Sequence, residues 1–100
     1  MIRVLIVDDQ ALIREGLSLM LDLYGEIEIA GEASNGKEAI EFVEREEVDV
    51  ILMDIRMPVM DGVEATKVIK EKHPNIKIII LTMRMNTYSR ALKTALTAMY

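Results

Sequence analysis

The sequence predicts an α/β domain built on a doubly wound parallel sheet with helices on both faces. Two observations support this fold class. Apolar runs alternate with segments of helical spacing, in a strand–helix order repeated four times along the chain, and such alternation is typical of parallel sheets. The first, third and fourth runs are also almost entirely aliphatic, as parallel strands buried on both faces are.

The first half of the chain contains two predicted strands and one helix. Ile2–Val7 is a continuous aliphatic run and predicts the first strand. Helical spacing follows over Ala11–Tyr24 until Gly25, a residue type that commonly ends helices. The strand predicted at Ile27–Ala33 alternates apolar and acidic residues, so we expect it at an edge of the sheet. The apolar face expected for the helix consists of Leu12, Ile13, Leu17, Met20, Leu21 and Tyr24.

The second half repeats the same units. A helix is predicted over Lys37–Glu46 and a third strand over Val48–Met53. A loop with proline and glycine then precedes a helix over Val63–Lys72, and a fourth strand is predicted at Ile76–Leu81. Helical spacing returns over Met85–Met99. The apolar face expected for the third helix consists of Val63, Val68 and Ile69.

Composition restricts the function classes. One hundred residues suffice for one small domain with its own core. The net charge of −5 argues against a nucleic-acid-binding surface. The apolar runs are too short to span a membrane, the start lacks the features of a signal peptide, and no cysteine offers a disulfide or a thiolate ligand. We therefore expect a soluble cytoplasmic domain without direct contact to nucleic acid or membrane.

The predicted strand ends carry the polar residues that point to function. Asp8 and Asp9 follow the first strand, Asp54 follows the third, and Thr82 follows the fourth. Ligands of open parallel sheets bind at the carboxyl ends of the strands, so these side chains converge if the three strands are neighbours. Carboxylates this close repel one another, and a hard cation such as Mg²⁺ would relieve the repulsion. On this interpretation Asp54 is ionised, exposed at the rim of the sheet and paired with the metal.

A carboxylate beside Mg²⁺ can also act as a nucleophile. Aspartyl phosphate is a known type of covalent intermediate, and phosphoryl transfer depends mainly on positioning and charge neutralisation. Thr82 would then donate its hydroxyl to a phosphoryl oxygen. Each acid taken singly is more typical of a helix cap or a solvated loop, and Thr82 alone is an ordinary strand-end residue. Their joint occurrence at three strand ends favours a site.

Three motifs resemble the receiver domain of two-component response regulators. They are Val-Leu-Ile-Val-Asp8-Asp9, Leu-Met-Asp54-Ile-Arg-Met-Pro-Val-Met-Asp-Gly62 and Ile-Ile-Ile-Leu-Thr82. Residues 2–82 carry the resemblance almost without gaps. Two more stretches, Asp-Gln-Ala-Leu-Ile-Arg-Glu-Gly-Leu and Ala-Ser-Asn-Gly-Lys-Glu-Ala, resemble the subfamily whose receivers precede a helix-turn-helix DNA-binding domain. The resemblance implies a flavodoxin-like sheet of order 2-1-3-4, here with the fifth strand missing.

The resemblance also implies a role for each matched residue. Asp54 would accept a phosphoryl group from a histidine kinase, which makes the domain a phospho-acceptor and not an enzyme. Asp9 would bind Mg²⁺ directly and Asp8 through water, with Asp54 and the main-chain carbonyl of Arg56 as further ligands. Thr82 would move toward the phosphoryl group and pull the following loop with it. The parent protein would be a transcriptional regulator.

Residues 83–100 depart from the family pattern. Receivers continue with a Gly-Ala-x-Gly-Tyr turn, a fifth strand with a lysine that pairs with the phosphoryl group, and a fifth helix, whereas this segment has no glycine and a helical pattern of apolar residues. We therefore expect a receiver core over 1–82 and an atypical, truncated helical tail over 83–100. A one-nucleotide shift of reading frame near codons 83 and 84 would account for the change. The uncovered fourth strand or the tail helix would favour a homo-oligomer.

Other functions remain open from the residues alone. A Mg²⁺-dependent phosphatase of the haloacid dehalogenase type also uses an aspartate nucleophile. That class carries an Asp-x-Asp motif after the first strand, whereas this chain has Asp8-Asp9-Gln10. A flavodoxin-like cofactor site would need Ser, Thr and Gly after that strand to bind phosphate. A further alternative is a phosphorylation-impaired receiver that acts only as a self-associating interaction module.

Overall fold

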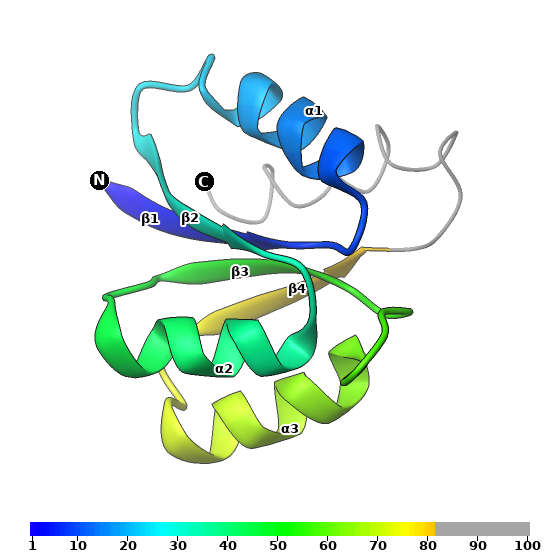
Figure 1. Cartoon of the computed structure of the whole chain (residues 1–100). Helices are drawn as coiled ribbons and strands as arrows, with labels where there is room; N and C mark the ends of the chain where they lie inside the picture. The colour runs from blue at the N-terminus through cyan, green and yellow to red at the C-terminus, as the bar shows by residue number, and fades with distance from the viewer. Residues whose placement is uncertain (82–100) are drawn as a thin grey trace.

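The computed structural model describes residues 1–81, which form one sheet with helices on both of its faces (Figure 1). The strands are parallel and lie in the order β2-β1-β3-β4. The predicted α/β class and the flavodoxin-like order 2-1-3-4 are thus confirmed. The elements are β1 (Ile2–Val7), α1 (Ala11–Leu21), β2 (Ile27–Ala33), α2 (Gly36–Arg45), β3 (Val50–Asp54), α3 (Gly62–Lys72) and β4 (Lys77–Leu81).

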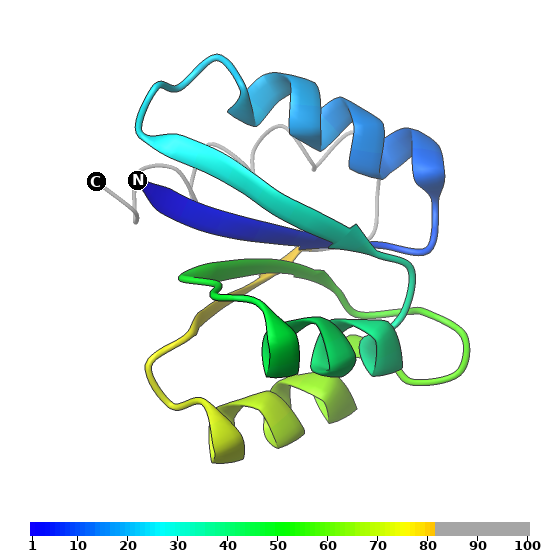
Figure 2. The same cartoon turned by 60° about the vertical axis from the view of Figure 1, so that its left-hand side comes forward.

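The sheet separates two apolar layers. α1 lies on one face of the sheet, and α2 and α3 lie on the other, as two views show (Figures 1 and 2). Alternate residues of β1 serve the two layers. Val4 and Ile6 pack with the buried side chains of α1, whereas Leu5 and Val7 pack with those of α2 and α3. Burial on both faces explains why the β1 run is continuously aliphatic.

α1 is shorter than the predicted helix and buries a narrower stripe. Its buried residues are Ile13, Leu17 and Leu21, spaced by four. Leu12 is 73% exposed, Met20 43% and Tyr24 39%, so the prediction that these three lie on the buried face was wrong. Successive residues of a helix are about 100° apart, so Leu12 points away from the sheet when Ile13 faces it. Among residues 1–81, α1 is the single helix on this face of the sheet (Figure 1), and only its central row of side chains is buried.

α3 also buries a narrower stripe than predicted, and β3 differs from its predicted bounds. The buried apolar residues of α3 are Ala65 and Ile69. Val63 is 58% exposed, so its predicted place on the apolar face was wrong. β3 extends to Asp54 instead of ending at Met53. The acid expected beyond the strand is therefore its last residue, held in the backbone ladder opposite Leu81 of β4.

β2 and β4 are the edges of the sheet within residues 1–81. The edge position predicted for the polar strand is confirmed for β2, which has exposed or half-buried residues along most of its length. The tail predicted over 83–100, its helix at Met85–Met99 and the missing fifth strand all lie outside the described residues. Within residues 1–81, no helix combines the length and the apolar composition needed to cross a membrane.

Two leucines of α1 should differ in their contribution to stability. Leu17 is 4% exposed and Leu19 is 66% exposed. We expect Leu17→Ala to lower the free energy of unfolding by about 2–4 kcal/mol, because it removes buried methyl groups and leaves a cavity. Leu19→Ala is the matched control and should change that free energy by less than about 0.5 kcal/mol. Urea unfolding measures both, and equal losses would contradict the packing of α1.

Candidate metal centre

Three carboxylates meet at the carboxyl ends of β1 and β3. These strands are paired so that Val7 lies opposite Met53. The residues that follow, Asp8 and Asp54, therefore lie side by side at the carboxyl end of the sheet. Together with Asp9 they place carboxylate oxygens within 4.8 Å of one another. The structure thus brings together the three acids that the sequence singles out.

Asp54 is buried, which corrects the exposed rim position expected from the sequence. The residue is 3% exposed. The N–H groups of Ile55 and Arg56 donate to its carboxylate, whereas Oδ1 is buried and has no hydrogen-bond partner within residues 1–81. Burial, followed by the charges of Asp8 and Asp9, raises the pKa of Asp54 to about 6. A bound cation would stabilise the ionised form of such a group.

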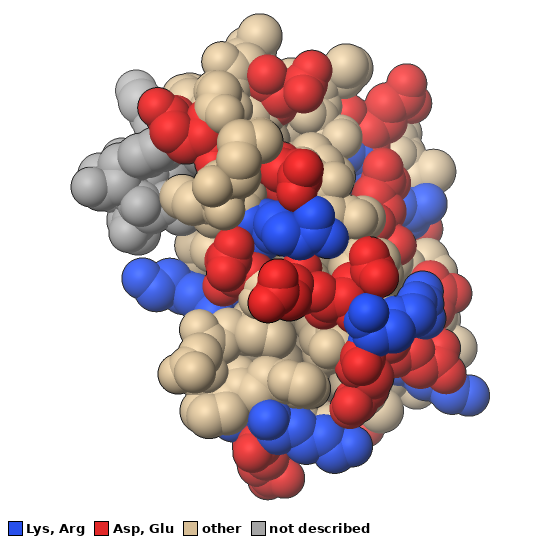
Figure 3. Space-filling model, turned by 90° about the vertical axis from the view of Figure 1, so that its left-hand side faces the viewer, with Lys and Arg blue, Asp and Glu red and all other residues tan. Residues whose placement is uncertain are grey.

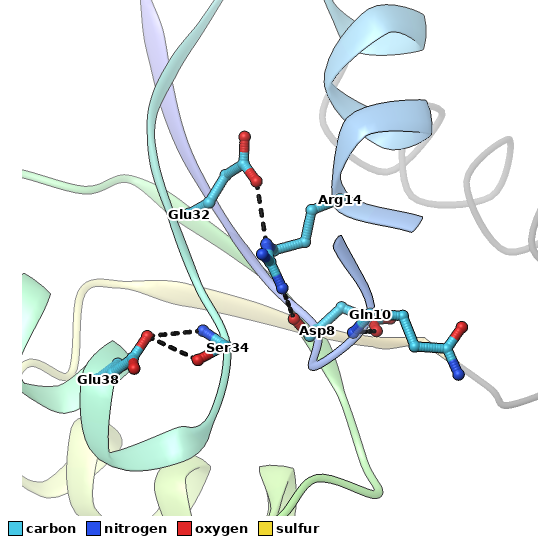
Figure 4. Close-up of polar contacts among 6 residues, drawn as sticks. All are labelled: Asp8, Gln10, Arg14, Glu32, Ser34 and Glu38. Carbon is cyan, nitrogen blue, oxygen red and sulfur yellow. Dashed lines mark hydrogen bonds and ion pairs between the residues drawn. The ribbon is translucent and has the colours of Figure 1, made fainter. Parts of the chain in front are cut away.

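The turn after β1 holds Asp8 and leaves Asp9 exposed. The Asp8 N–H donates to the carbonyl of Ala33 at 3.1 Å, and its Oδ1 accepts the N–H of Gln10 at 2.9 Å. The main-chain carbonyl of Asp8 accepts a hydrogen bond of 2.6 Å from Arg14 Nη1 (Figure 4). Asp9 is therefore the acid of this group that an ion from solvent reaches most easily.

The loop after β3 is folded tightly against Asp54. The Gly62 N–H donates to the carbonyl of Ile55 at 2.8 Å. A Cβ added to Gly62 would lie 2.1 Å from the carbonyl oxygen of Asp54, so a larger residue there must displace the backbone of the acid. This close approach leaves room only for glycine beside the main chain of Asp54.

The middle of the same loop holds a strained turn. The N–H of Met60 donates to the carbonyl of Pro58 at 2.8 Å across Val59. Val59 has a φ of 70°, which is unusual for a β-branched residue and is typical of a rare γ-turn. The Met60 carbonyl accepts the N–H of Gly36 in α2 at 2.9 Å, and the Asp61 side chain caps α3. The loop is therefore tied to two helices.

The structure places only part of what was predicted for Arg56 and Thr82. Arg56 lies two residues after Asp54 in the chain, and its main-chain N–H donates to the Asp54 carboxylate. That the Arg56 carbonyl also binds the metal stays a prediction. Thr82 lies outside the described residues. Its neighbour Leu81, the last residue of β4, is paired with Asp54, so β4 ends beside this acid.

The donor set suits Mg²⁺. This ion prefers an octahedron of oxygen ligands that includes one or two carboxylates and several waters. Asp8, Asp9 and Asp54 supply carboxylate oxygens at compatible separations. Sulfur and imidazole ligands, which would favour zinc or copper, are not part of this cluster, since the chain has no cysteine and His73 is the C-cap of α3. The residues present therefore fit a hard divalent cation.

The opposite end of the strands has a different electrostatic character. Acidic and basic side chains lie beside one another over that face (Figure 3). Arg3 contacts Glu28 and Glu46, and Lys72 contacts Glu44. A surface pocket at this end is lined in part by Arg3, Glu44 and Lys72, away from the three aspartates. Because Glu28, Glu44 and Glu46 have cationic partners, this end is the weaker candidate for a cation site.

Two residues that shape the site are hard to recognise from the sequence. Gly62 has the pattern of an ordinary turn residue, and only the approach to Asp54 shows why glycine is needed. Arg14 belongs to a helix whose spacing says nothing of its hydrogen bond to Asp8. One signal for Arg14 does exist, because a cation near a helix N-terminus is electrostatically unfavourable and therefore suggests a specific partner.

Comparisons with known proteins agree with this geometry. The family described as response regulator receiver domain matches residues 4–99. The transcriptional regulatory protein LnrK of Bacillus subtilis is 48% identical over 82 residues, which cover 82% of this chain and 37% of LnrK. The chain thus spans little more than a third of the length of this curated relative.

Solved structures show the same fold. The response regulator domain of Thermotoga maritima CheB is similar, with a TM-score of 0.82 and 29% identity, and the match covers 97% of this chain and 92% of that one. A chain of the CheX–CheY–BeF₃–Mg complex from Borrelia burgdorferi has a TM-score of 0.77 and 27% identity, covering 92% of this chain and 71% of the other.

Glycine substitutions should distinguish the covering loop from the rest of the chain. We expect Gly62→Ala to lower the free energy of unfolding by about 1–3 kcal/mol, because its Cβ meets the Asp54 carbonyl. Gly16→Ala in α1 is the matched control. Its Cβ would meet nothing within 4 Å, so a gain of about 0.5–1 kcal/mol is expected from helix propensity. Chemical denaturation measures both, and a neutral Gly62→Ala would contradict the close approach.

The raised pKa of Asp54 predicts that the metal-free protein loses stability as the pH rises. The pKa is about 6 in the folded chain, against an ordinary value of 3.8. The folded state therefore binds more protons between these values, so the stabilising contribution of Asp54 is complete below the lower pKa and is lost as the pH rises through the higher one. From about pH 5 to about pH 7.5 the loss should be on the order of 1 kcal/mol.

Asp54→Asn is the control for this pH dependence, because an amide does not titrate. Urea unfolding of both proteins in EDTA should show the decline in the wild type only, after subtraction of the pH dependence that the two share. Identical curves for the two proteins would mean that Asp54 titrates normally and would contradict its buried, acid-rich surroundings.

Proposed function

Because the chain belongs to the response regulator receiver domain family, we propose that it accepts a phosphoryl group from a histidine kinase on Asp54. One observation carries the proposal. Asp54 is buried with an oxygen that has no partner within residues 1–81, and two further acids lie within 4.8 Å. Structural carboxylates in a protein interior normally have their oxygens satisfied, so this one is better explained as a nucleophile. The domain then serves as a phospho-acceptor and not as an enzyme.

In the proposed transfer, an ionised oxygen of Asp54 forms a bond to phosphorus while the bond from phosphorus to the imidazole nitrogen of the kinase breaks. The imidazole nitrogen keeps that electron pair and takes up a proton. A pKa of about 6 leaves Asp54 mostly ionised at neutral pH. The N–H groups of Ile55 and Arg56 hold the carboxylate in place, which favours a defined line of attack. Thr82 would donate its hydroxyl to a phosphoryl oxygen.

Asp8, Asp9 and Asp54 would hold Mg²⁺, with the carbonyl of Arg56 as a further ligand. When bound, the ion neutralises the charge that builds up between the carboxylates and the phosphoryl oxygens. Asp9 is exposed and would bind it directly. Asp8 is 1% exposed and already accepts the N–H of Gln10, so it would act through a water molecule.

The wider role of the chain is also part of the proposal. LnrK is named a transcriptional regulatory protein, and this chain spans 37% of its length. We infer a cytoplasmic transcriptional regulator whose receiver core is 1–82 and whose atypical segment is 83–100. Phosphorylation adds about −1.5 to −2 charges at neutral pH, which would move Thr82 and the loop after β4. Within residues 1–81 β4 is an edge strand, and such an edge would support self-association, while the domain itself would contact no nucleic acid.

The proposal predicts one phosphoryl group on Asp54 when the protein is incubated with Mg²⁺ and acetyl phosphate. Intact-mass spectrometry should show a single addition in the wild type and none in Asp54→Asn. Asp61→Asn is the matched control in the same loop. It keeps a helix-capping side chain at the start of α3 and should be labelled like the wild type. EDTA should prevent the addition.

Two results would contradict the proposal. Label that persists in Asp54→Asn would place the acceptor elsewhere. A wild-type protein that stays unlabelled by acetyl phosphate, and that also fails to bind beryllofluoride with Mg²⁺, would leave the chain as a self-associating interaction module instead of a phospho-acceptor.

A further inference from the structure

Arg14 of α1 lies against the turn that carries Asp8 and Asp9. Its Nη1 donates to the main-chain carbonyl of Asp8 at 2.6 Å, and its Nε donates to Oε1 of Glu32 at 3.0 Å (Figure 4). The Arg14 side chain is 18% exposed, so water competes little for these bonds. The guanidinium therefore joins α1, the end of β1 and the edge strand β2.

The carbonyl that Arg14 binds belongs to the peptide group between Asp8 and Asp9. A peptide group is planar, so its orientation sets the direction in which the Asp9 backbone leaves β1. The N–H of Asp8 is bonded to Ala33 and its side chain to Gln10. The bond from Arg14 adds a restraint on the carbonyl, and through it on Asp9.

We propose that Arg14 is a positioning residue for the metal, because it holds the peptide group between Asp8 and Asp9 so that both carboxylates face Asp54. This inference rests on the proposed function. It assigns Arg14 a geometric role, since the two hydrogen bonds described go to a carbonyl and to Glu32. The charges that act most strongly on Asp54 are those of the other two acids.

Arginine suits this position better than lysine does. The planar guanidinium presents several N–H donors in a fixed arrangement, so one side chain bonds the Asp8 carbonyl and Glu32 together. A cation near the N-terminus of α1 is disfavoured by the helix dipole, and the first turn of α1 has no acid to offset that cost. The two directed bonds give a reason for the arginine to be there.

A neighbouring pair of hydrogen bonds joins the end of β2 to α2. Glu38 of α2 accepts the N–H and the hydroxyl of Ser34 at 2.8 and 2.9 Å (Figure 4). These bonds, and to a smaller extent the charge of Arg14, lower the pKa of Glu38. The guanidinium itself is held by Glu32 of β2 and by the Asp8 carbonyl, while Glu38 is held by Ser34.

The test uses Mg²⁺ as the probe and the whole chain as the sample. Isothermal titration calorimetry measures the Mg²⁺ affinity of the wild type, Arg14→Gln and Arg14→Lys. A positioning role predicts a loss of about tenfold or more in both variants, because neither retains both directed bonds. A near wild-type affinity in Arg14→Lys would show that charge alone is sufficient and would overturn the proposal.

Arg3 provides a matched control at the other end of β1. It also bonds a main-chain carbonyl, that of Glu47, and a glutamate of β2, Glu28. Arg3→Gln therefore removes the same kinds of contact at a place far from Asp8, Asp9 and Asp54. It should leave the Mg²⁺ affinity unchanged. A loss equal to that of Arg14→Gln would show a general loss of stability, and the positioning role would be wrong.

A second measurement does not depend on the metal. The main-chain N–H of Gln10 donates to Asp8 Oδ1. In EDTA the hydrogen exchange of this N–H should be faster in Arg14→Gln than in the wild type, because the turn has lost a restraint. Unchanged exchange at this amide would overturn the proposal. A wild type that binds no Mg²⁺ would refute the proposed function together with this inference, whereas a wild type that binds it and variants that bind equally well would refute the inference alone.

Discussion

The register between β1 and β3 is the constraint on which the rest of the structure depends. The pairing of Val7 with Met53 places Asp8 and Asp54 side by side at the carboxyl ends of β1 and β3. A slip of one residue would move one acid by about 3.3 Å along the strand and turn its side chain to the other face. The two apolar layers oppose such a slip, because alternate residues of β1 pack on opposite layers of helices.

That register has an energetic cost that the core must offset. It holds two buried acids and one exposed acid close together, and burial disfavours the ionised form of Asp54. The surrounding backbone reduces the cost only in part, through the N–H groups of Ile55 and Arg56. The site is thus a destabilising element kept in place by the packing around it, as is common where a protein binds ions or reacts.

Much of the fold and part of the site could be predicted from the sequence. The aliphatic runs and the acids that follow them are local features, and parallel pairing then brings the acids together. The burial of Asp54 could not be predicted, because it depends on how the loop after β3 folds, with Gly62 packed on the Asp54 carbonyl. The exposure of Leu12 and Val63 was missed for a related reason. Helical spacing identifies apolar residues but does not say how wide a stripe of each helix the sheet covers.

The γ-turn at Val59 bears on how this domain can change in evolution. Its loop is fixed at three places: Gly62 against Asp54, Met60 on Gly36, and Asp61 at the start of α3. Val59 is 79% exposed, so many side chains can replace it. One residue more or fewer would break at least one of the three attachments. Descendants of this chain are therefore free to exchange amino acids at the tip of the loop, while insertions and deletions between the acid and the glycine are selected against.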